Sequence, residues 1–178
     1  MVYLRDHSAV AGAVSTAMRA EASSLMVALG YDLSFARENE RETESSVLVV
    51  VDFRGYCDEQ HIPGGTPPAR PLATTAVADR AILPFSSLDC SALSQFLSPV
   101  LRTSPADSRA HVYGRALGRL LSHELYHIVR QTKQHQMHGV AQSSLSPWEL
   151  TSENFIGDFE RCKQRHKKIV SLRSSKSI

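Results

Sequence analysis

The chain has 178 residues, of which 42% are hydrophobic and 21% are charged, and its formal net charge is +2. These values are typical of a globular protein of one domain, and we expect that domain over residues 1–170, followed by a frayed basic tail over 171–178. The small net charge and the solvated character of the basic segment from Glu160 onward give no reason to expect a nucleic-acid partner. The longest aliphatic run, at 47–51, is far shorter than the ~20 residues that span a bilayer, so no membrane span is expected.

The N-terminus and the cysteines leave the cellular compartment open. The residues RDH at 5–7 interrupt the apolar core that a signal peptide would need, so this N-terminus is not expected to be one. A chain from which a signal had been removed would be secreted or periplasmic, and otherwise the chain would be cytoplasmic. No cysteine pair has CxxC spacing, which argues against a cysteine zinc site. A Cys57–Cys90 disulfide that leaves Cys162 free would suit an oxidising compartment.

The first half of the chain predicts one helix followed by strands. Residues 8–30 are rich in alanine, leucine and methionine and end in a glycine, which predicts a helix. The alternation in 31–37 predicts a strand, and the apolar stretch SSVLVVVDFRG at 45–55 predicts a central strand buried on both faces. Residues 73–86 predict two short strands or one irregular edge strand, and Pro84 is expected to keep the second away from the middle of the sheet.

The second half of the chain predicts helices. A short helix is expected over about 91–101. The sequence SPAD at 104–107 is a typical helix start, so we expect a long helix from 104 to about 130. The sequence SPWE at 146–149 has the pattern of a capping box and predicts a helix that continues to about 169. The order of elements indicates an α+β fold: a small, mixed, mostly antiparallel twisted sheet packed on the long helix, with an N-terminal and a C-terminal helix.

The long helix has two distinguishable faces. One is predicted to be a polar stripe that meets solvent, made of Arg115, Arg119, Ser122, Tyr126 and Arg130. The other, which carries His123 and His127, also carries Ala116 and Leu120, and Tyr113 is expected in the core. Gly114 and Gly118 lie one turn apart, which suggests that another backbone, expected to be a strand of the sheet, approaches the helix closely.

The segment SHELYHIVRQTKQHQMHG at 122–139 contains four of the eight histidines, two of them in a His-Glu-x-x-His motif. Histidines four residues apart on a helix can both bind one ion through neutral imidazole nitrogens. The intervening Glu124 can then accept a proton from a water molecule whose pKa the ion has lowered. His123 and His127 are therefore candidate metal ligands and Glu124 is the candidate catalytic base.

The HELYH motif on a late helix resembles the zincin zinc metallopeptidases, in particular their metzincin-like branch and small bacterial proteins with HELYH-type motifs. The specific resemblance covers residues 123–139, and the order of elements extends it loosely to most of the chain. It implies a zincin-like fold in which an antiparallel edge strand, here from residues 73–86, pairs with an extended peptide substrate. The glycine and histidine of the metzincin pattern would fall at Arg130 and Lys133, and no methionine follows Met137.

A third metal ligand must therefore come from elsewhere. The candidates are His135, His138, Glu149 and Glu153. We predict His135, because imidazole suits zinc and because the shorter loop loses less entropy on closure. Glu149 already has a capping role.

The sequence thus predicts a monomeric zinc metallopeptidase that binds one zinc ion and cleaves a peptide or protein with Glu124 as general base. One alternative is a metallohydrolase that is not a peptidase. The other is a metal-binding protein without turnover that acts as a binding or regulatory module. His61, in the loop rich in glycine and proline, is a second-choice site residue. Tyr126 is expected at the surface.

Overall fold

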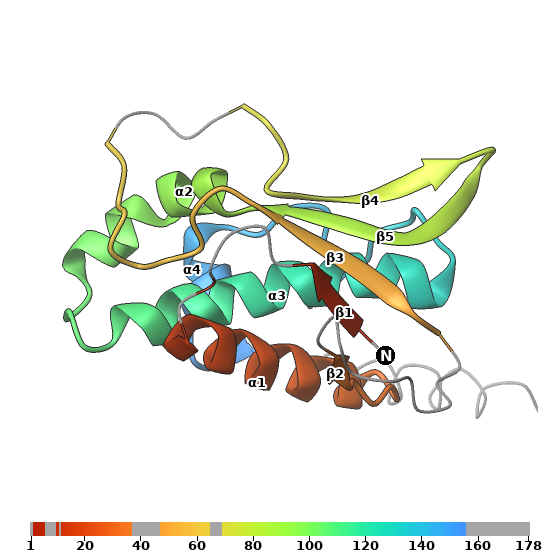
Figure 1. Ribbon diagram of the computed structural model, residues 1–178, viewed down its shortest axis with the longest axis horizontal. Coiled ribbons are helices and arrows are strands. Elements are labelled where there is room, and N and C mark those ends of the chain that lie inside the picture. The colour runs from red at the N-terminus through yellow and green to blue at the C-terminus, as the bar shows by residue number, and fades with distance from the viewer. Residues whose placement is uncertain (1, 6–9, 11, 37–46, 65–68, 156–178) are drawn as a thin grey trace, which may run out of the picture.

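The computed structural model describes residues 2–5, 10, 12–36, 47–64 and 69–155. Figure 1 shows a sheet that lies over a layer of helices. In chain order the elements are β1 (Val2–Arg5), α1 (Gly12–Ala28), β2 (Phe35–Ala36), β3 (Val49–Arg54), β4 (Ala73–Ala78), β5 (Ala81–Asp89), α2 (Cys90–Thr103), α3 (Arg109–Arg130) and α4 (Pro147–Thr151).

Among the described residues, the sheet has five strands in the order β2-β1-β3-β5-β4. It is mixed, as expected, but the prediction that it is mostly antiparallel is wrong. Of the four described strand pairs, β1–β2, β1–β3 and β3–β5 are parallel and β4–β5 is antiparallel. Antiparallel neighbours can be joined by a tight turn, whereas parallel neighbours need a long connection. A tight turn joins β4 and β5, while α1 and the long segment from β3 to β5 provide two of the longer connections.

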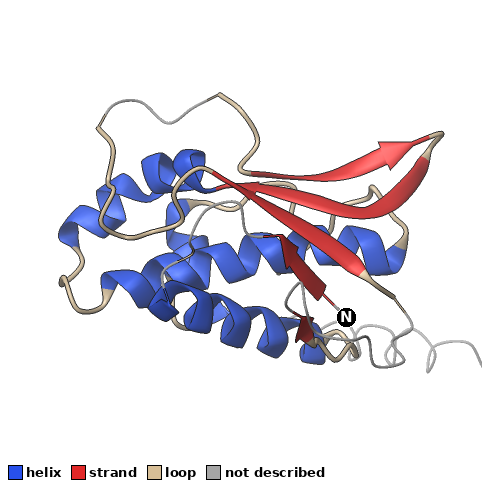
Figure 2. Cartoon of the chain, viewed as in Figure 1, coloured by secondary structure: helices blue, strands red, loops and turns tan. Residues whose placement is uncertain are grey.

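Strand β3 lies at the centre of the sheet, as the sequence predicts. Val49, Val51 and Phe53 are buried, whereas Val50 and Asp52 between them are half-buried. The prediction of full burial on both faces is therefore correct for one face only. Helices α1 and α3 lie along the same side of the sheet in Figure 2, and their apolar side chains join those of β3 in one core.

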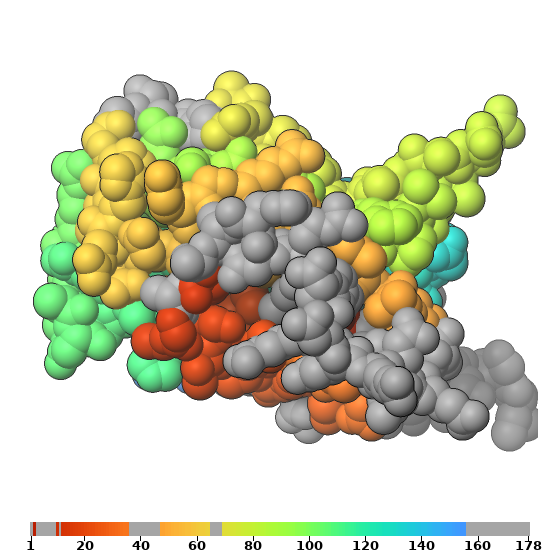
Figure 3. All heavy atoms as spheres, viewed as in Figure 1, coloured from red at the N-terminus to blue at the C-terminus, as the bar shows by residue number. Residues whose placement is uncertain are grey.

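Strands β4 and β5 form a hairpin with a two-residue turn at Asp79 and Arg80, whose φ angles are 48° and 69°. Two positive φ values are what a type I′ hairpin turn requires. For residues 73–86, the sequence left open two short strands or one irregular edge strand, and the structure has two strands. The hairpin projects from the body of the molecule in Figure 3.

Pro84 does not keep β5 at the edge, because β5 pairs with β3 on one side and with β4 on the other. Pairing with β3 begins only at Phe85, and the register with β4 shifts between Thr75 and Val77, opposite Pro84. A bulge of this kind leaves residues without a ladder partner, so a proline can occupy an interior strand there.

Helix α2 follows β5 directly. Asp89 caps it by accepting a hydrogen bond from the Ala92 amide at 2.8 Å. A disulfide joins Cys57 to Cys90 at its first residue, which is the pairing that the sequence left open. Ser104 ends α2 instead of capping the next helix: α3 begins at Arg109, four residues after Pro105, the first helical position that the SPAD sequence predicts.

The predicted solvent stripe of α3 is wrong for Arg119, Ser122 and Tyr126, which are buried. Arg130 is exposed as predicted, and Arg115 is half-buried. The Arg119 guanidinium donates to Glu21 Oε1 at 2.6 Å, and to the backbone carbonyls of Glu149 and Ser152 at 2.6 and 2.7 Å. It also lies over the ring of Phe155. The segment from α4 to Phe155 therefore covers the face that a helical periodicity alone assigns to solvent. Tyr113 is in the core, as predicted.

The backbone that approaches Gly114 and Gly118 belongs to α1, not to a strand. A Cβ atom at Gly114 would lie 2.6 Å from the Val14 carbonyl oxygen, and one at Gly118 would lie 2.6 Å from that of Met18. The two glycines thus allow α1 and α3 to pack with their backbones close together.

The capping box at Ser146 and Glu149 is present, but α4 ends at Thr151. Residues 152–154 do not continue it, so the predicted extension is wrong there. Outside the described residues lie 156–169 of this predicted helix, the tail at 171–178, Cys162, residues 8, 9 and 11 of the first predicted helix, residue 37 of the predicted strand, and residues 45 and 46 of the predicted central strand. Among the helices that the structure describes, none is long and apolar enough to cross a membrane.

Replacing Gly118 with alanine should destabilise the protein by roughly 1–3 kcal/mol, because the new methyl group would force α1 away from α3. The higher helix propensity of alanine, worth about 1 kcal/mol, opposes this loss only in part. Urea unfolding would measure the change. Gly12→Ala is the matched control, since a Cβ atom there meets nothing within 4 Å. Equal stabilities for the two variants would contradict this packing argument.

Candidate metal centre

The His-Glu-x-x-His motif occupies the last two turns of α3. The helix ends at Arg130, as predicted, because Gln131 adopts a left-handed conformation with φ of 47°. The Gln131 side chain donates to the carbonyls of Ile128 on α3 and of Ile82 on β5, at 2.8 and 3.3 Å. The chain therefore leaves the helix in a defined direction and returns past the motif.

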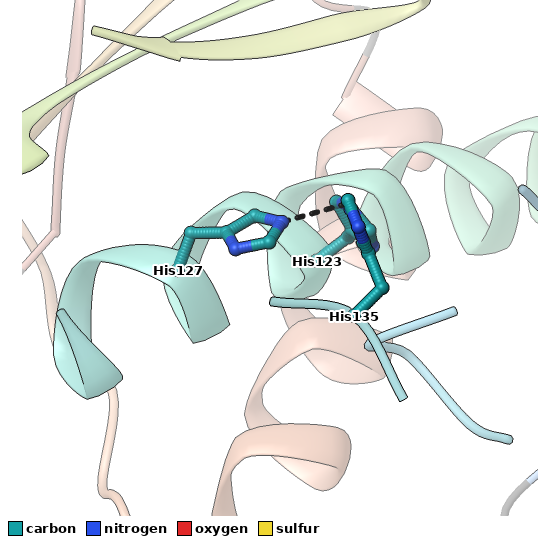
Figure 4. A group of neighbouring side chains, drawn as sticks. All are labelled: His123, His127 and His135. Atoms are coloured by element: carbon teal, nitrogen blue, oxygen red, sulfur yellow. Dashed lines mark hydrogen bonds between the residues drawn. The ribbon is translucent and has the colours of Figure 1, made fainter. Parts of the chain in front are cut away.

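Three histidines meet at this point. One ligand atom from each of His123, His127 and His135 lies within 4.8 Å of the others. The Nε2 atoms of His123 and His127 are 3.1 Å apart, and the centroid of the His135 ring lies 5.3 Å from the first ring and 4.9 Å from the second. Figure 4 shows the two helical rings directed toward each other, with His135 reaching them from the returning segment. The three histidines are close enough to bind one metal ion.

The other candidate ligands lie elsewhere. Among the described residues, the group that could hold a metal contains neither His138 nor the two glutamates. Glu149 accepts from the Ser146 amide and hydroxyl, and Glu153 forms an ion pair with Arg115 at 3.6 Å. His61 is exposed in the loop after β3, where its amide donates to Asp58.

Backbone carbonyls fix the orientation of both helical histidines. Nδ1 of His123 lies 2.6 Å from the Val140 carbonyl oxygen, and Nδ1 of His127 lies 2.7 Å from that of Thr132. A carbonyl oxygen only accepts, so each Nδ1 must carry the proton and each neutral ring presents a lone pair at Nε2. Two lone pairs at 3.1 Å repel each other unless a cation or a shared proton lies between them. The donor set therefore fits a metal ion, and the two carbonyls are the orienting partners that metal-bound histidines usually have.

The segment from Thr132 to Ala141 supplies the third histidine as well as both carbonyls. Val140 and Ala141 anchor it in a small apolar cluster with Leu25, Tyr126 and Phe155. Gln136 adds two hydrogen bonds. Its backbone amide donates to the Ala141 carbonyl at 2.7 Å, and its side-chain amide donates to the Tyr126 hydroxyl at 3.1 Å.

Tyr126 is thus a buried anchor of the ligand-bearing segment, and its expected place at the surface is wrong. Sequence reasoning missed Val140 as well. The signal available was the apolar pair Val140-Ala141 directly after Gly139, in a segment that is otherwise polar.

Glu124 points from α3 toward the sheet. Its side chain is buried, and its Oε2 atom accepts a hydrogen bond of 2.5 Å from the Thr75 hydroxyl on β4. Burial raises the pKa of Glu124 above its usual value, an effect that the Thr75 hydrogen bond opposes in part. Sequence reasoning did not identify Thr75, because no local pattern connects residues 49 positions apart.

The surroundings of His123 and His135 favour the neutral form of these two side chains. Burial lowers the pKa of His123 to about 4 and also lowers the pKa of His135. Neutral imidazole is the form that binds a metal, so His123 remains a competent ligand through neutral and mildly acidic pH. The site therefore combines three metal-binding nitrogens with an adjacent buried carboxyl group that can take up a proton.

Comparison of the chain with models of known protein families, with curated proteins and with solved structures gives no match.

His135→Ala should weaken metal binding much more than His138→Ala, because only His135 lies in the three-histidine group. Loss of one of three protein ligands is expected to reduce the affinity at least about 100-fold, more than the 10–100-fold typical of an orienting partner. Titration against a chromophoric zinc chelator would measure both variants. His138→Ala is the matched control, since His138 is an exposed histidine of the same segment. A larger loss in His138→Ala would assign the third ligand to that residue instead.

Proposed function

We propose that the protein is a zinc-dependent hydrolase of the zincin type, and specifically a metallopeptidase. The observation that carries the proposal is the arrangement at the end of α3, where three imidazoles meet beside a buried carboxyl group. His123, His127 and His135 would hold the ion, and Glu124 would act as general base.

The donor set supports zinc as the metal. Imidazole suits several first-row metals, and three protein ligands with a remaining open position are typical of catalytic zinc. When bound, zinc lowers the pKa of a coordinated water molecule to near 7. The orienting carbonyls of Thr132 and Val140 keep two of the imidazoles directed at the ion without rearrangement.

Glu124 would move the proton during hydrolysis. The Thr75 hydroxyl donates a hydrogen bond to Oε2 of Glu124. We therefore assign proton transfer to the other carboxylate oxygen, Oε1. That atom would accept a proton from the attacking water and later deliver it to the nitrogen of the leaving amine. A carboxyl group whose pKa is raised by burial is better matched to this exchange near neutral pH than an exposed one.

The sheet supports a peptide as the substrate. Strand β4 stands at the end of the strand order and, among the described strands, pairs with β5 alone. An extended peptide can add to such an edge through main-chain hydrogen bonds. The resemblance to zincins implies this role for residues 73–86, and the edge itself is Ala73–Ala78. Because Thr75 on this strand contacts Glu124, a peptide paired with β4 would lie near the base.

The purified protein should take up about one zinc ion per chain, because one group of three histidines can bind one ion. Mass-spectrometric metal analysis after zinc addition and gel filtration would give the stoichiometry. A chelator should lower the melting temperature, since a ligand that binds only the folded state stabilises it. The double variant His123→Ala/His127→Ala is the control that should retain no zinc. A wild-type protein without bound metal at neutral pH would end the proposal.

Glu124→Gln should keep the zinc but lower peptide hydrolysis by roughly 100- to 10,000-fold, because an amide cannot accept the proton of water. Cleavage of a mixed peptide library, followed by mass spectrometry, would measure the loss without a known substrate. Glu153→Gln is the matched control, because that carboxylate is exposed and pairs only with Arg115 among the described ion pairs.

Two other outcomes of this experiment would count against the assignment. If Glu124→Gln emptied the metal site, Glu124 would be a ligand and not the base. If the wild type bound zinc but cleaved no peptide, the peptidase assignment would fail, and a non-peptidase metallohydrolase or a metal-binding protein without turnover would remain.

A further inference from the structure

Thr75 connects the edge strand to the proposed base. It lies on β4 at the sheet edge, 49 positions before Glu124, and its hydroxyl donates to Glu124 Oε2 at 2.5 Å. This is a hydrogen bond to a group that can be ionised, a type that is both short and strong. The contact brings together two elements that are remote in the sequence.

Ser86 in turn holds Thr75. The two residues are directly opposed in the β4–β5 ladder, and their hydroxyl oxygens are 3.0 Å apart. Each hydroxyl has one proton, and that of Thr75 is given to Glu124, so Ser86 is the donor of this second hydrogen bond. The result is a directed chain from Ser86 on β5, through Thr75 on β4, to the carboxyl group on α3.

The surroundings of Thr75 and Ser86 restrict the conformations of this series of hydrogen-bonded side chains. Thr75 is the last residue before the register shift in the β4–β5 pairing, and Ser86 is its partner at that point. Bulges next to active sites often direct a side chain out of the regular alternation. Threonine is β-branched, so its χ1 rotation is restricted and its hydroxyl has few alternative positions. Ser86 is buried and Thr75 is half-buried, which limits competition from water.

We propose that Thr75 is a positioning residue that fixes the Glu124 carboxylate for proton transfer, and that Ser86 supports it. This inference rests on the proposed hydrolase function. A glutamate side chain has three rotatable bonds, so without Thr75 the carboxylate would sample several orientations above α3. When the Thr75 hydroxyl holds Oε2, the Glu124 carboxylate presents Oε1 in one direction. The edge strand then both offers its backbone to a peptide and aligns the base that acts on it.

Thr75→Val removes the hydroxyl with little change in shape, and Thr75→Ser keeps it. Thr75→Val should retain one zinc ion per chain with a KM within about two-fold of the wild type, while kcat falls about 10- to 100-fold, as expected for a misplaced catalytic group. Thr75→Ser should restore most of the lost kcat. Thr103→Val is the matched control, because Thr103 is an exposed threonine at the end of α2, away from both the edge strand and the three histidines.

A readout independent of activity comes from crystal structures of the zinc-loaded variants. The Glu124 carboxylate should leave its wild-type position in Thr75→Val and keep it in Thr75→Ser. An unmoved carboxylate, an unchanged kcat, or loss of zinc in Thr75→Val would each overturn the proposal. If the wild type cleaves no peptide, the hydrolase function fails, and the carboxylate positions still decide whether Thr75 fixes Glu124.

Ser86→Ala provides a second variant if Thr75→Val does not fold. It removes the donor to Thr75 but leaves the Thr75–Glu124 contact, so kcat should fall less than in Thr75→Val, with the same unchanged KM. A kcat equal to that of the wild type would show that Ser86 has no part in the arrangement.

Discussion

Helix α3 is buried along most of its length, and it carries polar side chains that must find partners away from water. An unpaired polar group inside a protein is costly, so the neighbouring elements have to supply those partners. Glu21 on α1 and two backbone carbonyls, one within α4 and one directly after it, supply them for Arg119. Thr75 on β4 does so for Glu124. The elements around α3 are thus placed by the requirements of its polar residues as well as by apolar packing.

The need to pair buried polar groups also links the candidate metal centre to the face of α3 that carries Arg119. The segment from Thr132 to Ala141 gives its carbonyls to two histidines and contributes the third, and it is anchored beside Phe155. Phe155 in turn packs against Arg119, which lies one turn before His123. A metal ion bound by the three histidines would therefore hold α3 and the returning segment together. Stability of the segment and affinity for the ion should be coupled for this reason.

The sheet contributes to the site through the antiparallel pair of β4 and β5. The parallel strands β1, β3 and β5 build the core over α1 and α3, whereas β4 extends the sheet to an edge above the motif. The bulge near Pro84 changes the register at the place where Thr75 meets Glu124. A regular ladder would continue the strict alternation of side chains, so the irregularity belongs to the geometry of the site.

Local patterns in the sequence were sufficient for features set by neighbouring residues: the presence of α1, though at Gly12–Ala28 and not over the full 8–30, the central strand, the end of α3 at Arg130, the capping box at Ser146 and the grouping of His135 with the motif histidines. Short-range spacing determines these. Only the tertiary structure decided four other features. These are the parallel pairing of the strands, the burial of Arg119 and Tyr126, the approach of α1 to Gly118 and the contact of Thr75 with Glu124. Each depends on residues brought together from distant parts of the chain, and helical or strand periodicity carries no information about which element covers a given face.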